Sequence, residues 1–354
     1  MMEAKIERLV ETSKQVITDC SLENGAIVAA NCFKDYFPKD AKYYTYVWPR
    51  DASFTCVAAD ILGIGIQEKF FDWCMTRAEG FQNTGLFYEK YFVNGLKALK
   101  RFQPDQTGSI LWAVWYHFKD DLKKASRYKK LIRKAANGIC EKWKNDHFTV
   151  VTNDLWEERL TFPDLKENLT YSLAACIKGL ECANAIIPHK RWSEVANMMR
   201  KRLESHYDDY FFRSHGKLSD KGIDASALGL VYPFEILSPS DSRVVATVRE
   251  MEARIVINGG LHRYEHDEYD GWMYETMHRK KGGGAWPLLN FWMSIYNARV
   301  GDKEKALQYY NWVLDKVDRF IPEQIFDNDI QVSVSPLCWS HSMFIIASKE
   351  LKYI

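Results

Sequence analysis

The densest group of potentially reactive side chains is the segment 154–159, which reads Asp-Leu-Trp-Glu-Glu-Arg. It places three carboxyl groups within five positions around one tryptophan. Clustered carboxylates repel one another, and an apolar ring beside a carboxyl group raises its pKa and favours the protonated form. The segment is therefore either a solvated acidic turn or the source of a general acid, and Glu157 beside Trp156 is the strongest candidate for that acid.

A second carboxyl group of interest is Glu323, which follows Ile321-Pro322 in a predicted loop. A single glutamate in a loop is ordinarily solvated, so its interest comes from its position. It is far from Glu157 in the sequence, yet both belong to long loops that we expect at one end of the fold. Together they would supply what cleavage of a glycosidic bond requires, one protonated and one ionised carboxyl group.

The segment 46–51, Tyr-Val-Trp-Pro-Arg-Asp, precedes a predicted helix. Two interpretations remain open. Asp51 could cap the helix while Arg50 pairs with it, which is a structural role. Alternatively, Arg50 and Asp51 donate to and accept from the vicinal hydroxyl groups of a sugar, and Trp48 forms an apolar wall beside them.

Two further motifs suggest a metal or a phosphate group, and neither has the right context. Residues 262–266 match the H-x-x-E-H order of a zinc protease, in which both histidines must share one face of a helix. Here the motif follows Gly-Gly, which favours a loop. The glycine run 282–284 lacks the spacing of a phosphate-binding loop. We therefore predict no catalytic metal and no cofactor.

The composition excludes several classes of protein. The 354 residues carry 48 Lys and Arg against 47 Asp and Glu, so nothing electrostatic favours a nucleic-acid partner. No apolar run approaches the ~20 residues of a membrane span, and the N-terminus does not resemble a signal peptide. None of the eight cysteines forms a C-x-x-C pair, which predicts buried free thiols and a cytoplasmic location. The oligomeric state stays open.

Apolar residues recur at helical spacing through most of the chain, in about twelve segments that form six sequential pairs. A closed α-barrel of two rings is favoured over a solenoid, because no sequence repeat is present. We expect an all-α fold with a single catalytic domain over 1–354, in which 1–42 form an N-terminal helix and lead-in. The predicted helices cover 6–17, 51–62, 66–79, 105–119, 121–144, 165–185, 190–207, 225–236, 241–255, 286–299, 302–317 and 337–351.

The connections between these helices alternate in length. Those before the second helix of each pair are long and rich in Trp, Gly, Asp and Glu, whereas those after it, such as 63–65, are short. We therefore expect one end of the barrel to carry the functional residues and the other to be structural. The long connections are 38–50, 80–104, 145–163, 256–285 and 318–336.

Taken together, these motifs resemble the glucoamylase-type glycoside hydrolases, a group that includes glucodextranases and archaeal and bacterial trehalases. The resemblance runs from about Tyr43 to Ile346 and implies an (α/α)6 barrel of six helical hairpins. The motifs occur in the order of that family, which makes them specific as a set. They are 46–52, 103–113, 154–159, 260–264, 286–288 and 322–324.

The resemblance also implies a role for each site residue. Glu157 is expected to be the general acid and Glu323 the base that activates water, so Glu157 should be protonated where Glu323 is ionised. Asp154 is expected to orient its own loop. The residues expected to bind substrate are Trp48, Arg50, Asp51, Asp105, Trp156, Glu158, Arg263 and Trp286.

The implied activity is inverting, exo-acting hydrolysis that releases β-glucose from the non-reducing ends of α-glucosides or short α-glucans. The implied partner is thus a small oligosaccharide or α-glucan. Two alternatives stay open: a trehalase-type hydrolase, and a non-catalytic sugar-binding regulatory relative. We expect no β-sandwich and no starch-binding module of the kind that many relatives carry, which would argue against long, granular substrates.

Overall fold

The computed structural model of the protein describes residues 2–39, 41–271, 282–328 and 330–354, and within them the chain is mostly helical. Residues 272–281 of the predicted loop 256–285 lie outside the described residues. The α-helices are α1 (Met2–Cys20), α2 (Pro49–Leu62), α3 (Gln67–Thr76), α4 (Phe81–Thr84), α5 (Pro104–Phe118), α6 (Lys129–Lys142), α7 (Thr170–Ile186), α8 (Lys190–Glu204), α9 (Ser242–Arg254), α10 (Pro287–Val300), α11 (Lys303–Lys316) and α12 (Cys338–Glu350). The 3-10 helices are η1 (Lys124–Tyr128), η2 (Pro163–Leu165) and η3 (Ala225–Leu230).

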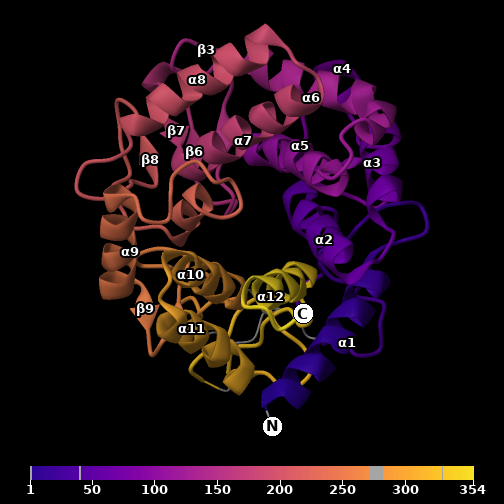
Figure 1. Ribbon diagram of the computed structural model, residues 1–354, viewed down its shortest axis with the longest axis vertical. Helices are drawn as coiled ribbons and strands as arrows, with labels where there is room; N and C mark the ends of the chain where they lie inside the picture. Colours follow the sequence, from indigo (N-terminus) through magenta and orange to yellow (C-terminus); the bar gives the residue numbers. More distant parts are fainter. Residues whose placement is uncertain (1, 40, 272–281, 329) are drawn as a thin grey trace.

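Six of these helices form a closed inner ring. In chain order, α2, α5, α7, η3, α10 and α12 each contact the next, and α12 contacts α2 again. Figure 1 shows the other long helices, α1, α3, α6, α8, α9 and α11, around the outside of this ring. The chain therefore alternates between an outer and an inner helix along its length.

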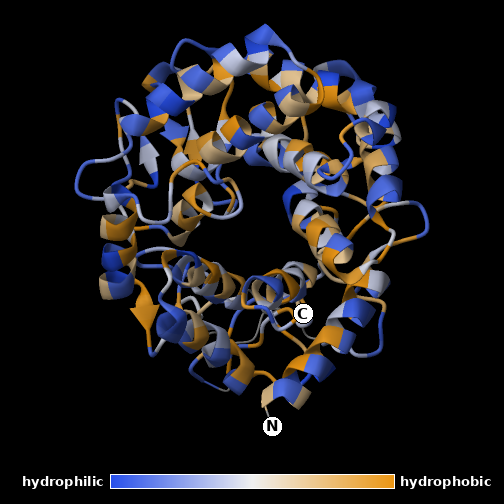
Figure 2. Cartoon of the chain, viewed as in Figure 1, coloured by the Kyte–Doolittle hydropathy of each residue, from blue (hydrophilic) through white to orange (hydrophobic). Residues whose placement is uncertain are grey.

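The sequence explains why each helix lies in its ring. The outer helix α8 is amphipathic: its buried residues recur every three or four positions, and Lys and Arg occupy much of the rest. The inner helices α10 and α12 are buried on all sides, over 287–297 and 338–348. Figure 2 shows hydrophilic and hydrophobic residues together on the outer helices.

Two glycines allow the inner helices α5 and α7 to pack closely. A Cβ atom on Gly108 would lie 2.3 Å from the carbonyl oxygen of Ala175, and one on Gly179 would lie 2.7 Å from the Cα atom of Gly108. Neither position has room for a side chain. The backbone of α5 therefore lies against that of α7, which brings the loops that precede these two helices together.

The structure corrects three of the predicted helices. The segment 225–236 forms only the short helix η3, because Pro233 cannot donate the hydrogen bond that a longer helix needs. The segment 121–144 divides into η1 and α6. The segment predicted as a helix from 165 contains η2 and a strand before α7 begins at Thr170.

The long connections carry five two-stranded antiparallel sheets. The hairpin β5–β6 encloses the acidic segment 154–159, and β1 lies in the connection before α5. Short connections follow inner helices, as between α2 and α3 and between α10 and α11, so the predicted alternation is confirmed. The strands are β1 (Tyr88–Tyr91), β2 (Lys97–Phe102), β3 (Trp143–Lys144), β4 (His147–Phe148), β5 (Thr152–Asn153), β6 (Leu160–Thr161), β7 (Asn168–Leu169), β8 (Ser214–His215), β9 (Val256–Ile257) and β10 (Gly260–Leu261).

Candidate active site

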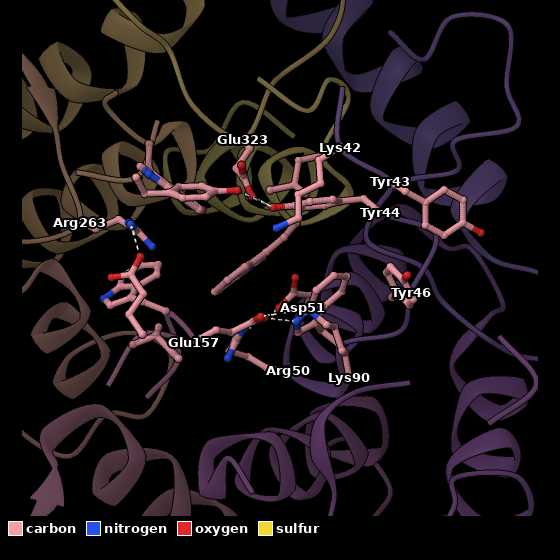
Figure 3. A pocket seen from close by; sticks show the side chains of 18 residues that line it. Lys42, Tyr43, Tyr44, Tyr46, Arg50, Asp51, Lys90, Glu157, Arg263 and Glu323 are labelled. Atoms are coloured by element: carbon pink, nitrogen blue, oxygen red, sulfur yellow. Dashed lines mark hydrogen bonds and ion pairs between the residues drawn. The ribbon is translucent and has the colours of Figure 1, made fainter. Parts of the chain in front are cut away.

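A cavity of about 260 Å³ brings the long connections together, and nine of the ten predicted site residues line it. Figure 3 shows Glu157 and Glu323 on opposite sides of this pocket. They come from the β5–β6 hairpin and from the loop before α12, so the ring joins residues that are far apart in the sequence. The lining residues include Trp48, Arg50, Asp51, Trp156, Glu157, Glu158, Arg263, Trp286 and Glu323.

Arg50 lies in the first turn of α2 and is held in place by three acceptors, of which Asp51 lines the pocket. Its Nε donates to Asp51 Oδ1 at 3.2 Å, and its Nη1 donates to Asp105 Oδ2 at 3.0 Å and to Gln103 Oε1 at 3.2 Å. The guanidinium also lies 5.1 Å from the ring centre of Trp339. Only 3% of the Arg50 side chain is exposed, so its orientation is fixed before any ligand binds.

The prediction that Asp105 binds substrate is wrong. Its side chain is completely buried and does not line the pocket. It lies behind Arg50, because α5 begins at Pro104 and the first turn of that helix is covered by α2 and α7. Asp105 therefore orients Arg50 and does not reach the cavity.

Asp51 lines the pocket and does not cap α2, because the capping position is Trp48 and no side chain accepts a capping bond there. The capping interpretation is thus wrong, although Arg50 does pair with Asp51. Burial raises the pKa of Asp51 to about 7, Arg50 works against that rise, and the charge of Glu157 adds to it. Asp51 is therefore partly protonated near neutral pH, and either form can accept from a hydroxyl group.

The acidic segment is held by Asp154, as predicted. Its Oδ1 accepts from the backbone N–H groups of Glu158 at 2.8 Å and Arg159 at 2.9 Å, and its Oδ2 contacts Arg213. Glu157, the residue before Glu158, has a φ of +67°. This is the left-handed region, which residues other than glycine rarely adopt. Such a conformation costs on the order of 1–3 kcal/mol and is common at functional sites.

The Glu157 carboxyl group contacts residues from two other segments. Trp48 Nε1 donates to its Oε1, and Lys90 Nζ lies 3.1 Å from its Oε2. The Trp156 indole nitrogen does not bind this carboxyl group but donates to Asp224 Oδ2 at 3.0 Å. Trp156 still lines the pocket, beside Trp286.

Glu157 also lies against Glu89, and the two carboxyl groups titrate as a pair. Burial raises the pKa of Glu89 to about 8, and the charge of Glu157 adds to that rise. Burial opposes ionisation of Glu157 as well, but Lys90, a hydrogen bond with Glu89 and the Trp48 donor outweigh it and lower the pKa of Glu157.

Glu323 is buried opposite this pair. Its Oε1 accepts from the Tyr44 hydroxyl at 2.7 Å, and Tyr44 lies 3.1 Å from the Tyr269 hydroxyl. Burial raises the pKa of Glu323, while the Tyr44 donor and the charges of Lys42 and Arg263 oppose that rise. The lowered pKa of Glu157 and the raised pKa of Glu323 contradict the expected order, in which Glu157 has the higher pKa. That expectation left out Glu89, whose carboxyl group interacts with that of Glu157.

The third wall of the pocket is built around Arg263. Its Nε and Nη2 donate to both oxygens of Asp267 at 2.8 and 2.7 Å, and its Nη2 donates to Glu158 Oε1 at 2.8 Å. The guanidinium lies 5.2 Å from the ring centre of Trp286 and 4.9 Å from that of Tyr269. Glu158 is thus paired; it lines the pocket, and about one third of its side chain is exposed.

Several residues in or next to the pocket were missed from the sequence. Tyr44 binds Glu323 and contacts Tyr269, Lys90 binds Glu157, and Asp267 binds Arg263. Tyr44 lies two positions from the motif 46–51, which is a usable signal. Lys90 belongs to an ordinary strand, β1, and only the folded chain places it in the pocket.

The remaining predicted features have simpler outcomes. The motif 262–266 lies in a loop after β10, as expected, and within the described ranges no three His, Cys, Asp or Glu side chains gather as a metal site. All eight cysteines are free, and all except Cys32 are buried. No helix in the described part of the chain is long and apolar enough to cross a membrane.

Two curated relatives match most of this chain. An uncharacterized glycosyl hydrolase of Methanocaldococcus jannaschii is 32% identical over 357 residues, which cover 92% of this chain and 53% of the relative. The chain therefore spans about half the length of that relative. The isomaltose glucohydrolase of Kribbella flavida is 24% identical over 391 residues, which cover 98% of this chain and 94% of that enzyme.

Solved structures share the fold over the whole chain. A glycosidase variant superposes with a TM-score of 0.82 at 23% identity and covers 100% of this chain and 98% of its own. A bacterial glucoamylase complexed with acarbose superposes with a TM-score of 0.73 at 19% identity, over 97% of this chain and 55% of the other. Residues 14–349 match the family described as Glycosyl hydrolases family 15, and the chain therefore belongs to that family of glycoside hydrolases.

Proposed function

We propose that the chain is an inverting, exo-acting hydrolase that releases β-glucose from the non-reducing ends of short α-glucosides. The observation that carries this proposal is that Glu157 and Glu323 line one cavity from opposite sides. An inverting enzyme needs a general acid and a general base far enough apart for a water molecule, roughly 6.5–9.5 Å. The two residues belong to different loops of the ring, which favours such a separation.

In the proposed reaction, Glu157 protonates the glycosidic oxygen as the bond to the anomeric carbon breaks. Glu323 takes a proton from a water molecule that attacks the same carbon from the opposite face. Within the described residues, Glu323 Oε2 is buried and has no hydrogen-bond partner, while Oε1 accepts from Tyr44. Oε2 is therefore the oxygen that we assign to the water.

The inner end of the pocket supports exo-action. Arg50 and Asp51, beneath Trp339, form a fixed donor and acceptor that suit the hydroxyl groups of a terminal sugar. A chain that continued past this point would meet buried side chains. Only the end of a glucan would then fit, which matches a cavity of about 260 Å³.

We propose a disaccharide or short oligosaccharide as the substrate, with isomaltose as the first candidate. The isomaltose glucohydrolase of Kribbella flavida matches nearly the full length of both chains, which supports a compact enzyme for a small substrate. Product release from maltose, isomaltose, trehalose, maltotetraose and dextran, measured side by side, tests this choice. Preference for trehalose would favour the trehalase alternative, and preference for dextran would overturn the short-substrate proposal.

Proton NMR during the first minutes of hydrolysis tests the mechanism. Attack from the face opposite the leaving group converts an α-linkage into a β-anomer, so β-glucose should appear before mutarotation mixes the anomers. The Glu323→Gln variant should lose this product. Early α-glucose would indicate retention and would remove Glu323 from the role of base. Absence of hydrolysis with every sugar tested would leave the non-catalytic alternative.

The same proposal includes the fold. We infer an (α/α)6 barrel, in which η3 takes the inner position of the fourth helical pair. The closed ring of inner helices and the superposition on a glucoamylase support this inference. The single-domain organisation and the cytoplasmic location stay predictions from the sequence.

A further inference from the structure

Glu89 is an acidic side chain beside the proposed general acid, and the reaction above gives it no part. It lies on β1, and its side chain is completely enclosed. The Lys90 ammonium lies 3.7 Å from Glu89 Oε1 and 3.1 Å from Glu157 Oε2. One cation therefore contacts two carboxyl groups, and only Glu157 of these lines the pocket.

The two oxygens of Glu89 differ in their surroundings. Oε2 accepts from Asn153 Nδ2 at 2.7 Å and lies 3.9 Å from Arg101 Nη1. Oε1 is buried and has no hydrogen-bond donor within the described residues. A buried carboxylate oxygen without a donor is costly, so this oxygen favours a proton. When two carboxyl groups meet at such a site, one proton shared between them is the stable arrangement.

We propose that Glu89 is a positioning residue that holds one proton in common with Glu157, so that the pair still has a proton for the general acid toward neutral pH. This inference rests on the proposed function. In the reactive form the proton lies on Glu157, and Glu89 is the anion that Lys90 and Asn153 hold. After Glu157 has protonated the leaving oxygen, the pair takes one proton from solvent and is restored.

The charges around the pair determine its working range. Lys90 and Arg101 face it from the β1–β2 hairpin, and Asp51 and Glu323 face Glu157 across the pocket. Burial and the charge of Glu157 outweigh the cations and raise the pKa of Glu89 to about 8. The pair therefore keeps its shared proton up to about pH 8, and activity should fall above that pH.

The Glu89→Gln variant tests this inference through the pH dependence of kcat/KM, which reports the free enzyme. Glutamine keeps the shape, but its amide cannot share a proton and can donate to an ionised Glu157. We expect the basic limb to move at least one pH unit toward lower pH, while the acidic limb stays in place. A purely structural role would lower kcat/KM by the same factor at every pH.

Two further variants complete the design. Glu252→Gln is the control, because Glu252 binds Lys305 and Tyr309 on the outer helices, away from the pocket, and it should move neither limb. Asn153→Ala removes a donor to Glu89 and should move the basic limb in the opposite direction, toward higher pH. If Glu89→Gln does not fold, the direction in which Asn153→Ala moves the basic limb tests the inference instead.

The outcomes separate this inference from the proposed function. An unmoved basic limb in Glu89→Gln, or a limb that moves toward lower pH in Asn153→Ala, overturns the role of Glu89. If Glu157→Gln is inactive at the same time, the proposed function survives. If Glu157→Gln keeps full activity, or if the unmodified protein hydrolyses no α-glucoside, both fail together.

Discussion

Replacement of Arg50 by lysine tests whether the fixed guanidinium in the pocket binds substrate. Arginine bridges Asp51, Asp105 and Gln103 with atoms of one planar group. Lysine keeps the charge but has a single nitrogen, so it cannot reach these acceptors in the same directions. At least one charge-assisted hydrogen bond is lost within the protein, and the fixed donor toward the ligand is lost as well.

The size of the effect follows from these contacts. A hydrogen bond to a charged group contributes about 1.5–3 kcal/mol. Loss of one such bond to a sugar hydroxyl in the transition state should lower kcat/KM by roughly 10- to 150-fold, since 1.4 kcal/mol corresponds to a factor of ten. Loss of one inside the protein should lower the free energy of unfolding by a similar amount, about 1.5–3 kcal/mol.

Steady-state kinetics on the best substrate and urea unfolding measure the two effects separately. Arg299→Lys is the matched control, because Arg299 bridges Glu350 at 2.9 Å and Glu235 at 3.4 Å away from the pocket. It should lose some stability and keep its kcat/KM. If Arg50→Lys kept the kcat/KM of the unmodified protein, Arg50 would have only a structural role and the assignment of the inner pocket end would be wrong.

Three further results are expected from the carboxyl groups. Glu157→Gln should lower kcat by on the order of 10²–10⁴, since a positioned general acid contributes that much, and unchanged kinetics would remove it from the role. Tyr44→Phe removes a donor that lowers the pKa of Glu323, so the acidic limb of kcat/KM should move toward higher pH. Glu89 has a pKa of about 8 in the folded chain against 4.5 as its ordinary value, so its contribution to stability is complete below pH 4.5 and is lost as the pH rises through 8. Urea midpoints of the unmodified protein should therefore fall more between pH 5 and 9 than those of Glu89→Gln, and equal slopes would contradict the raised pKa.

The helical pattern and the position of most site residues were predictable from the sequence. Amphipathic spacing marks α8 clearly, and the long inner helices read as continuous apolar runs. The boundaries of η3 were harder to predict, because the apolar residues around Gly229 and Pro233 look helical. Pro233 is a local signal that the helix ends early. The packing of Tyr171 against Gly229 is a tertiary contact, which local pattern does not contain.

Within the site, residue types were easier to predict than their partners. Trp156 and Glu157 are neighbours in the sequence, yet the indole that binds the carboxyl group is Trp48, about one hundred positions earlier. Neighbouring residues on an extended or turning backbone point in different directions, so adjacency says little about contact. Asp105 shows the same limit. It belongs to a predicted motif, yet it contributes to the site only indirectly, by binding Arg50 from outside the pocket.

The protonation of the site shows why these partners matter for function. One buried carboxyl group beside a cation is expected to ionise, and Lys90 together with the Trp48 donor favours that outcome for Glu157. A general acid with those neighbours alone would lose its proton in the acidic range and work poorly near neutrality. Glu89 changes this balance, because two carboxyl groups that face one ammonium group keep one proton between them. A carboxyl group outside the pocket can thus determine the pH range of a residue inside it, and strand β1 holds it there with its side chain buried.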